Sequence, residues 1–67
     1  MKENDLKAEI ARNNYTIPSL ARAMRIGKKA LYAKIGGKSQ FKQEEIKSLK
    51  SVLSLSDAQV LDIFFAD

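Results

Sequence analysis

The sequence predicts an all-α fold, a compact bundle of five short helices that forms a single domain over residues 1–67. Apolar residues recur three and four positions apart in five segments, which is the spacing of a helix with one buried side. The breaks between these segments are only a few residues long, and no strand-like alternation has a useful length. Because the chain has no cysteine, packing alone must hold this small core together.

The first two helices are expected over Asp5–Asn13 and Ile17–Met24. Asn4 or Asp5 can cap the first helix, and the asparagines at its end tolerate a left-handed cap. Thr16 is a good N-cap for the second helix, and Pro18 falls in its first turn, where the missing N–H costs nothing. The residues expected to be buried are Leu6, Ile10, Leu20, Ala21 and Met24, with Ile17 as a further candidate.

The third helix is expected over Lys28–Ile35, with Gly27 at its N-cap position and Gly36-Gly37 as its stop. The fourth is expected over Gln43–Leu53, and Phe41 in the preceding loop is expected to anchor the core. The apolar positions of these two helices are Leu31, Ile35, Ile46, Leu49 and Leu53.

The fifth helix begins in LSDAQVLDIFF, where Ser56 and Gln59 have the spacing of a capping box. Glu44 and Glu45, at the start of the fourth helix, suit the positive end of its dipole. The apolar face of the fifth helix holds Val60, Ile63 and Phe64, and it is broadened by Leu61 and Phe65.

The charges are sorted along the chain. Residues 1–9 sum to −1 and residues 44–67 to −3, although the whole chain carries +4. Between them no anion occurs, and the cations are Arg12, Arg22, Arg25, Lys28, Lys29, Lys34, Lys38 and Lys42. A polyanionic partner would offset the self-repulsion of this block and gain by counterion release. The alternative is a solvated basic face without a partner.

The missing residue types narrow the function classes. Without His or Cys the chain lacks the usual zinc ligands and the usual general base near neutral pH. We therefore expect no metal, no cofactor, no small-molecule ligand and no enzymatic activity. No apolar run approaches the roughly 20 residues that cross a bilayer, and MKENDLKAEI is too charged for a secretory signal. A cytoplasmic protein with no membrane association is expected.

The second and third helices are short and joined by a tight turn, the geometry of a helix-turn-helix, whose second helix enters the DNA major groove. TIPSLARAMRIGKKALYAKIGGKSQF, residues 16–41, resembles the lambda-repressor-like (Cro/repressor, Xre-type) DNA-binding domains. It is most similar to small phage regulators whose third helix ends in a Leu-Tyr-x-Lys-hydrophobic-x-Gly-Lys run, here residues 31–38. The spacing of Thr16 from Leu20-Ala21 also matches, and LSDAQVLDIFF resembles the last helix of such proteins.

The resemblance implies a phage or prophage regulator, a Cro-like protein or a repressor, that binds a palindromic operator as a homodimer. The chain departs from the family pattern in the turn, where Gly is usual and Arg25 stands. That residue takes a positive φ, which strains Arg by roughly 1 kcal/mol. Gly27 and Lys42 stand where the family prefers a Ser or Thr cap.

A helical wheel separates the two sides of the third helix. With Leu31 at 0° and about 100° per residue, Ile35 lies near 40°, so the outward direction is near 200°. Ala33 lies in that direction, flanked by Lys29 and Gly36, and these small residues would let the helix seat deeply in the groove. The residues expected to contact bases are Lys28, Lys29, Tyr32 and Ala33, with Lys29 first because Lys binds guanine O6 and N7.

Phosphate contacts are expected on both sides of this helix, where they set the register without reading the sequence. The expected residues are Thr16, Ser19, Arg22, Lys34, Lys38, Ser39 and Lys42. Two alternatives stay open, because Tyr32 can be a partly buried packing residue and Lys34 can be simply solvated.

The fifth helix is more apolar than a surface helix needs to be. Phe64 and Phe65 are adjacent, so they cannot both face one core, and an exposed aromatic patch often marks an interface. We expect a homodimer whose interface holds Val60, Leu61, Phe64 and Phe65. The alternative is that Phe65 belongs to a frayed end.

These patterns favour a sequence-specific regulator of transcription that binds double-stranded DNA and reads the major groove with residues 28–35. A protein-interaction module, such as an antirepressor or an antitoxin-like partner that reuses the fold, is the second interpretation. It would explain the apolar fifth helix but not the sorted cations. Non-specific or RNA binding fits the charge, yet the chain lacks aromatic stacking pairs on a sheet or groove.

Overall fold

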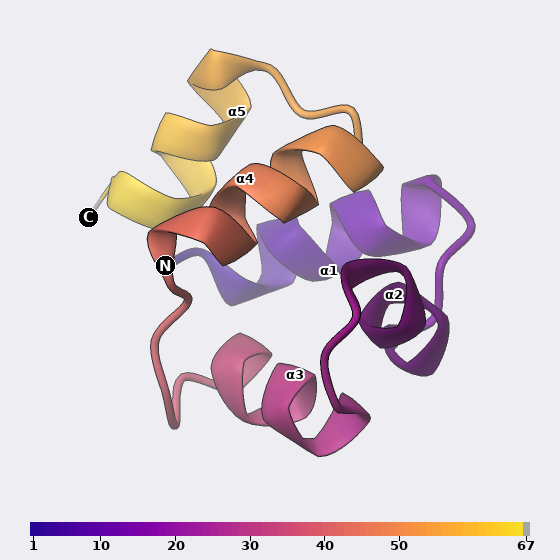
Figure 1. Cartoon of the computed structure of the whole chain (residues 1–67). Helices are drawn as coiled ribbons and strands as arrows, with labels where there is room; N and C mark the ends of the chain where they lie inside the picture. Colours follow the sequence, from indigo (N-terminus) through magenta and orange to yellow (C-terminus); the bar gives the residue numbers. More distant parts are fainter. Residues whose placement is uncertain (67) are drawn as a thin grey trace.

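The computed structural model describes residues 1–66 and confirms the all-helical bundle (Figure 1). Its helices, in chain order, are α1 (Glu3–Arg12), α2 (Ile17–Met24), α3 (Lys28–Ile35), α4 (Gln43–Val52) and α5 (Asp57–Val60). The last of these continues without a break into a π-helical turn, η1 (Leu61–Phe65). Residues 1–66 contain no strand.

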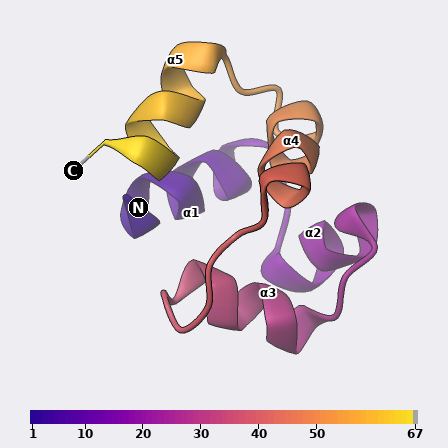
Figure 2. The ribbon, with the colours of Figure 1, turned by 60° about the vertical axis from the view of Figure 1, so that its left-hand side comes forward.

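The helices place α3 at one end of the molecule. Figures 1 and 2 both show α3 opposite α5, with α1 and α4 between them and α2 beside α3. The Cα positions span 26 × 24 × 21 Å, so no helix is far from the common core. One side of α3 is therefore left uncovered by the other helices.

The core is apolar throughout the described residues, with no buried polar side chain among them. Its buried members are Leu6, Ile10, Leu20, Ala21, Met24, Leu31, Ile35, Leu49, Leu53, Leu55 and Ile63. Phe41 packs against them as predicted, and its ring meets that of Phe64 edge-on, with the centroids 5.6 Å apart. Ile46, expected inside, is only half-buried and lies outside the core cluster.

The bounds of α2 and α3 are those predicted, because local signals mark both ends. Thr16 adopts the extended N-cap conformation, with Pro18 in the first turn of α2. Gly27 is the extended residue before α3, and Gly37, just beyond its end, has a φ of 84° that favours glycine. The Ser56–Gln59 capping box at the start of α5 is also confirmed.

The first helix begins two residues earlier than predicted, at Glu3, and no side chain among residues 1–66 caps it. The predicted caps lie inside the helix, and they are Asn4 and Asp5. The segment before α1 is instead fixed by η1, since the Lys2 amide donates to the Ile63 carbonyl at 2.7 Å. The Lys2 ammonium also contacts the Asp62 carboxylate at 2.6 Å. A tertiary contact thus sets this helix start.

Candidate nucleic-acid interface

The turn Arg25–Gly27 fixes α3 relative to α2. Arg25 ends α2 in the left-handed conformation predicted for it, with φ 61° and ψ 42°. The Ile26 amide then donates to the Ala21 carbonyl at 3.0 Å, and the Ile26 side chain packs against the core. The left-handed geometry costs about 1 kcal/mol for a residue with a Cβ, so the rest of the fold must hold it in place.

The buried stripe of α3 is the predicted one, with Leu31 and Ile35 almost fully enclosed. The uncovered side carries Lys28 and Lys29, which are exposed, and Tyr32, which is 52% exposed and outside the core cluster. A packing role for Tyr32 within this chain is therefore not supported.

Ala33 is less open than the wheel predicted, because the loop after α3 folds back on it. The amides of Lys38 and Ser39 donate to the Ala33 carbonyl at 2.9 and 3.3 Å. Ala33 is accordingly half-buried, whereas Gly36 is exposed. The open strip of α3 is thus Lys28, Lys29, Ala30 and Tyr32. Of the predicted Lys29–Ala33–Gly36 ridge, only Ala33 is not exposed.

Lys34 points inward toward α4. Its Nζ lies 2.7 Å from Oε1 of Glu45, and the two side chains are only 12% and 13% exposed. The same Nζ lies 3.4 Å from the Gln40 carbonyl oxygen. Lys34 is therefore not simply solvated, because its ammonium is engaged by Glu45 and Gln40 inside the fold.

Glu45 has a second role at the start of α4. The oxygen that accepts from Lys34 also accepts from the backbone amide of Lys42, at 2.7 Å. Lys42 has no acceptor on its side chain, so only the carboxylate half of a capping box is present. The Lys34 hydrogen bond, followed by the one from the Lys42 amide, lowers the pKa of Glu45 below its ordinary value.

Thr16 and Ser19, predicted to donate to phosphate, form a closed capping box. The Ser19 amide donates to the Thr16 hydroxyl at 3.2 Å, and the Thr16 amide donates to the Ser19 hydroxyl at 2.9 Å. Both hydroxyl groups also donate within this box, to Ser19 Oγ and to the Thr16 carbonyl. Because Pro18 has no amide hydrogen, the start of α2 offers little to a phosphate.

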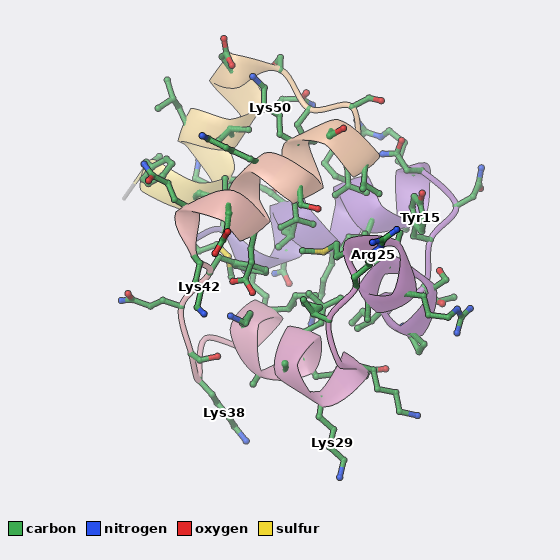
Figure 3. The ribbon with its side chains drawn as sticks, in the orientation of Figure 1. Tyr15, Arg25, Lys29, Lys38, Lys42 and Lys50 are labelled. Atoms are coloured by element: carbon green, nitrogen blue, oxygen red, sulfur yellow. The ribbon has the colours of Figure 1, made fainter. Side chains whose placement is uncertain are left out.

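Most cations of the basic block form no ion pair within residues 1–66. Arg12 is paired with Glu9 and Lys34 with Glu45. Within residues 1–66, no carboxylate lies within ion-pair distance of Arg22, Arg25, Lys28, Lys29, Lys38 or Lys42. Figure 3 shows Lys29 and Lys38 extending from the same end of the molecule, with Lys42 directed the same way and Arg25 directed elsewhere. Ser39, the remaining predicted contact, is exposed on the loop beside Lys38.

The predicted dimer residues divide into two pairs. Val60 and Phe64 are half-buried and pack against the core. Leu61 and Phe65 are 60% and 62% exposed. Beside Phe65 lies an open pocket of about 410 Å³. Its apolar lining includes Phe41, Ile46, Phe64 and Met1, the last of which sequence reasoning did not assign.

Glu45 and Gln40 are the other residues that sequence reasoning missed in this region. Glu45 follows the N-cap residue Lys42 by three positions, which is the spacing of a capping box and could have indicated half of its role. Its pairing with Lys34, eleven positions earlier, follows no local spacing.

The described part of the chain contains neither a metal-binding cluster nor a membrane-spanning helix. Residues 1–66 hold no group of three or more acidic, His or Cys side chains that could bind a metal. None of their helices has the length and apolar character to cross a membrane.

Comparison with known proteins gives no relative for this chain. No family model, no curated protein and no solved structure matches it. Function is therefore inferred from the chain's own residues.

Proposed function

We propose that the protein is a sequence-specific regulator of transcription that binds double-stranded DNA, with α3 in the major groove. One observation carries this proposal. The uncovered side of α3 presents Lys28, Lys29 and Tyr32, Lys38 extends from the same end of the molecule, and Lys42 is directed toward that end (Figure 3). Neither Lys38 nor Lys42 forms an ion pair within residues 1–66. A basic helix at the end of a bundle has the shape and the charge that a groove about 12 Å wide admits.

The residues of α3 differ in what they offer to a base pair. Lys29 and Lys28 can donate to guanine O6 and N7, and the Tyr32 ring can lie against a thymine methyl or the sugar. Ala33 remains a candidate for methyl contact, at the margin of the open strip. Phosphate contacts fall to Arg22, Lys38, Ser39 and Lys42, because Thr16, Ser19 and Lys34 use their donors inside the fold.

We further propose that the protein binds DNA as a homodimer. Two-fold dimers place their recognition helices in half-sites one helical turn apart on a palindromic operator. Leu61 and Phe65 are the exposed apolar side chains nearest the end of the described chain, and a second copy that covered them would remove their contact with water. Such a protein would be a Cro-like or repressor-like regulator of phage or prophage genes. It would act in the cytoplasm, without a cofactor and without enzymatic activity.

The exposed Leu61 and Phe65 also favour a second candidate, a protein-interaction module such as an antirepressor or an antitoxin-like partner. This candidate gives no role to the open basic strip of α3. A chain that bound another protein but showed no preference among duplexes would support it.

Selection from random-site duplex DNA, followed by titration across salt, tests the leading proposal. A regulator should enrich a short palindrome, and its affinity should fall steeply with salt because several phosphates are neutralised per dimer. Equal affinity for every duplex would exclude a sequence-specific regulator.

Two alanine variants separate base contacts from phosphate contacts. Lys29→Ala should relax specificity at one base position in each half-site and weaken binding by about 1–3 kcal/mol per half-site. Lys38→Ala should weaken binding evenly across sequences and reduce the salt slope by about 2, because the dimer loses one phosphate contact in each copy. Titration of each variant on single-base operator variants gives both quantities. The reverse pattern would show that the two residues exchange roles.

A further inference from the structure

We infer that Lys34 and Glu45 are positioning residues for DNA binding, whose enclosed ion pair holds the loop 36–42 in place. This loop carries Lys38 and Lys42, two of the proposed phosphate contacts. The inference rests on the proposed DNA-binding function, and it assigns a role to the one predicted contact residue that the fold turns inward.

The pair ties the loop to a helix on each side. Lys34 lies in α3, and its ammonium donates to Glu45 in α4 at 2.7 Å. The same ammonium contacts the carbonyl of Gln40 at 3.4 Å, and the same carboxylate oxygen accepts from the Lys42 amide at 2.7 Å. Two side chains therefore fix the end of the loop at both Gln40 and Lys42.

Enclosure distinguishes this pair from the other ion pairs of residues 1–66. Lys34 and Glu45 are 12% and 13% exposed. In each other pair at least one partner is far more open, as in Lys7–Glu3, where the side chains are 50% and 42% exposed. Exposed pairs contribute little because water and salt screen them, whereas an enclosed pair is costly to break.

The start of the loop is held separately. The amides of Lys38 and Ser39 donate to the Ala33 carbonyl, at the end of α3. With both ends fixed, the loop presents Lys38 and Lys42 without having to become ordered on binding. A loop released by loss of the pair would lose that preorganisation, and its ordering would then oppose association.

A positioning role and a purely electrostatic role of Glu45 predict opposite changes in DNA affinity. Removal of a negative charge from a protein that binds a polyanion should by itself strengthen binding. If Glu45 positions the loop, Glu45→Gln should weaken binding instead. Glu44→Gln is the matched control, since Glu44 is the adjacent residue, is exposed and forms no ion pair with residues 1–66.

The measurement is fluorescence anisotropy of both variants with the selected operator and with a random duplex. We expect Glu45→Gln to lose about three- to tenfold in affinity for both duplexes, with the preference for the operator kept. Glu44→Gln should bind as tightly as the wild type or slightly tighter. Binding by Glu45→Gln that equals that of Glu44→Gln would overturn the positioning role.

Amide hydrogen exchange of the free proteins separates this inference from the proposed function. In Glu45→Gln the amide of Lys42, which donates to this side chain in the wild type, should exchange faster, while the Ile26 amide in the turn before α3 keeps its protection. Unchanged exchange at the Lys42 amide would overturn the inference alone. A wild-type chain that binds no duplex would overturn the proposed function, and with it the binding role of the pair. If Glu45→Gln does not fold, the double variant Lys34→Met/Glu45→Gln leaves no unpaired enclosed charge. It keeps the net charge of the wild type, so a loss of affinity for both duplexes would support the positioning role and unchanged affinity would overturn it.

Discussion

Arg25 occupies a backbone conformation that its side chain disfavours. Its φ of 61° lies in the left-handed region, as do those of Asn14 and Ser54, and each of these residues follows a helix. Asn tolerates this region because its short side chain can bond to nearby backbone, whereas Arg gains no such compensation. The turn before α3 therefore stores strain.

Arg25→Gly should stabilise the protein. The relief of about 1 kcal/mol of left-handed strain is partly offset by the greater freedom of glycine in the unfolded chain, which leaves about 0.5 kcal/mol. Arg25→Ala is the control, since it removes the same charge and keeps the strained φ. Urea unfolding of the two variants should give Arg25→Gly the higher midpoint. Equal midpoints would mean that the turn stores no strain.

At the scale of helices, the bounds were predicted correctly where the residues that start and stop a helix lie next to its ends. α2 and α3 match because Thr16, Gly27 and the Gly36-Gly37 pair act within a few residues of the helix ends they set. The start of α1 could not be predicted, since it depends on the carbonyl of Ile63, sixty-one positions from Lys2. The π-helical winding of η1 was also missed, because five residues of apolar spacing do not distinguish it from an α-helix.

In the candidate site, too, the features set by local spacing were predicted and those set by tertiary contacts were not. The buried stripe of α3 was predicted by its period, and so was the outward direction of Lys29. The covering of Ala33 by the loop and the inward turn of Lys34 depend on tertiary contacts that no spacing in the sequence encodes.

The pair that links α3 to α4 should make stability depend on pH. Lys34 lowers the pKa of Glu45 below its ordinary value near 4.5, so the folded state favours the carboxylate. The resulting stability is complete above that ordinary value and is lost as pH falls through the lowered one. Glu45→Gln should therefore be about 1–2 kcal/mol less stable than the wild type at pH 7, and this difference should shrink below about pH 4.

Urea unfolding at pH 7 and pH 3 measures this difference directly. Asp57, whose pKa is lowered by Lys50, titrates in both proteins, so its contribution cancels in the stability difference. Glu44→Gln should show no comparable loss at pH 7. A stability difference between wild type and Glu45→Gln that stayed constant across this range would argue against an ionised Glu45 in the fold.

At the scale of the whole molecule, Phe65 tests the proposed assembly. Phe65→Ser should abolish a homodimer while changing the free energy of unfolding of the monomer by only about 0.5 kcal/mol, because the ring is largely exposed. Sedimentation equilibrium at high micromolar concentration should show a dimer for the wild type and a monomer for the variant. A wild-type chain that stays monomeric with and without operator DNA would exclude this interface.

The contact of Lys2 with Ile63 has a consequence for how the chain could be reconnected. It brings the segment before α1 against η1, which both views of the ribbon show side by side (Figures 1 and 2). A short linker could therefore join Ala66 to Met1, and new ends could be opened at the exposed Asn14, ahead of α2. In such a circular permutant the contact of Lys2 with Ile63, now sixty-one positions apart, would become a local one. The permutant should keep the fold and form it faster, since closing short loops precedes closing long ones.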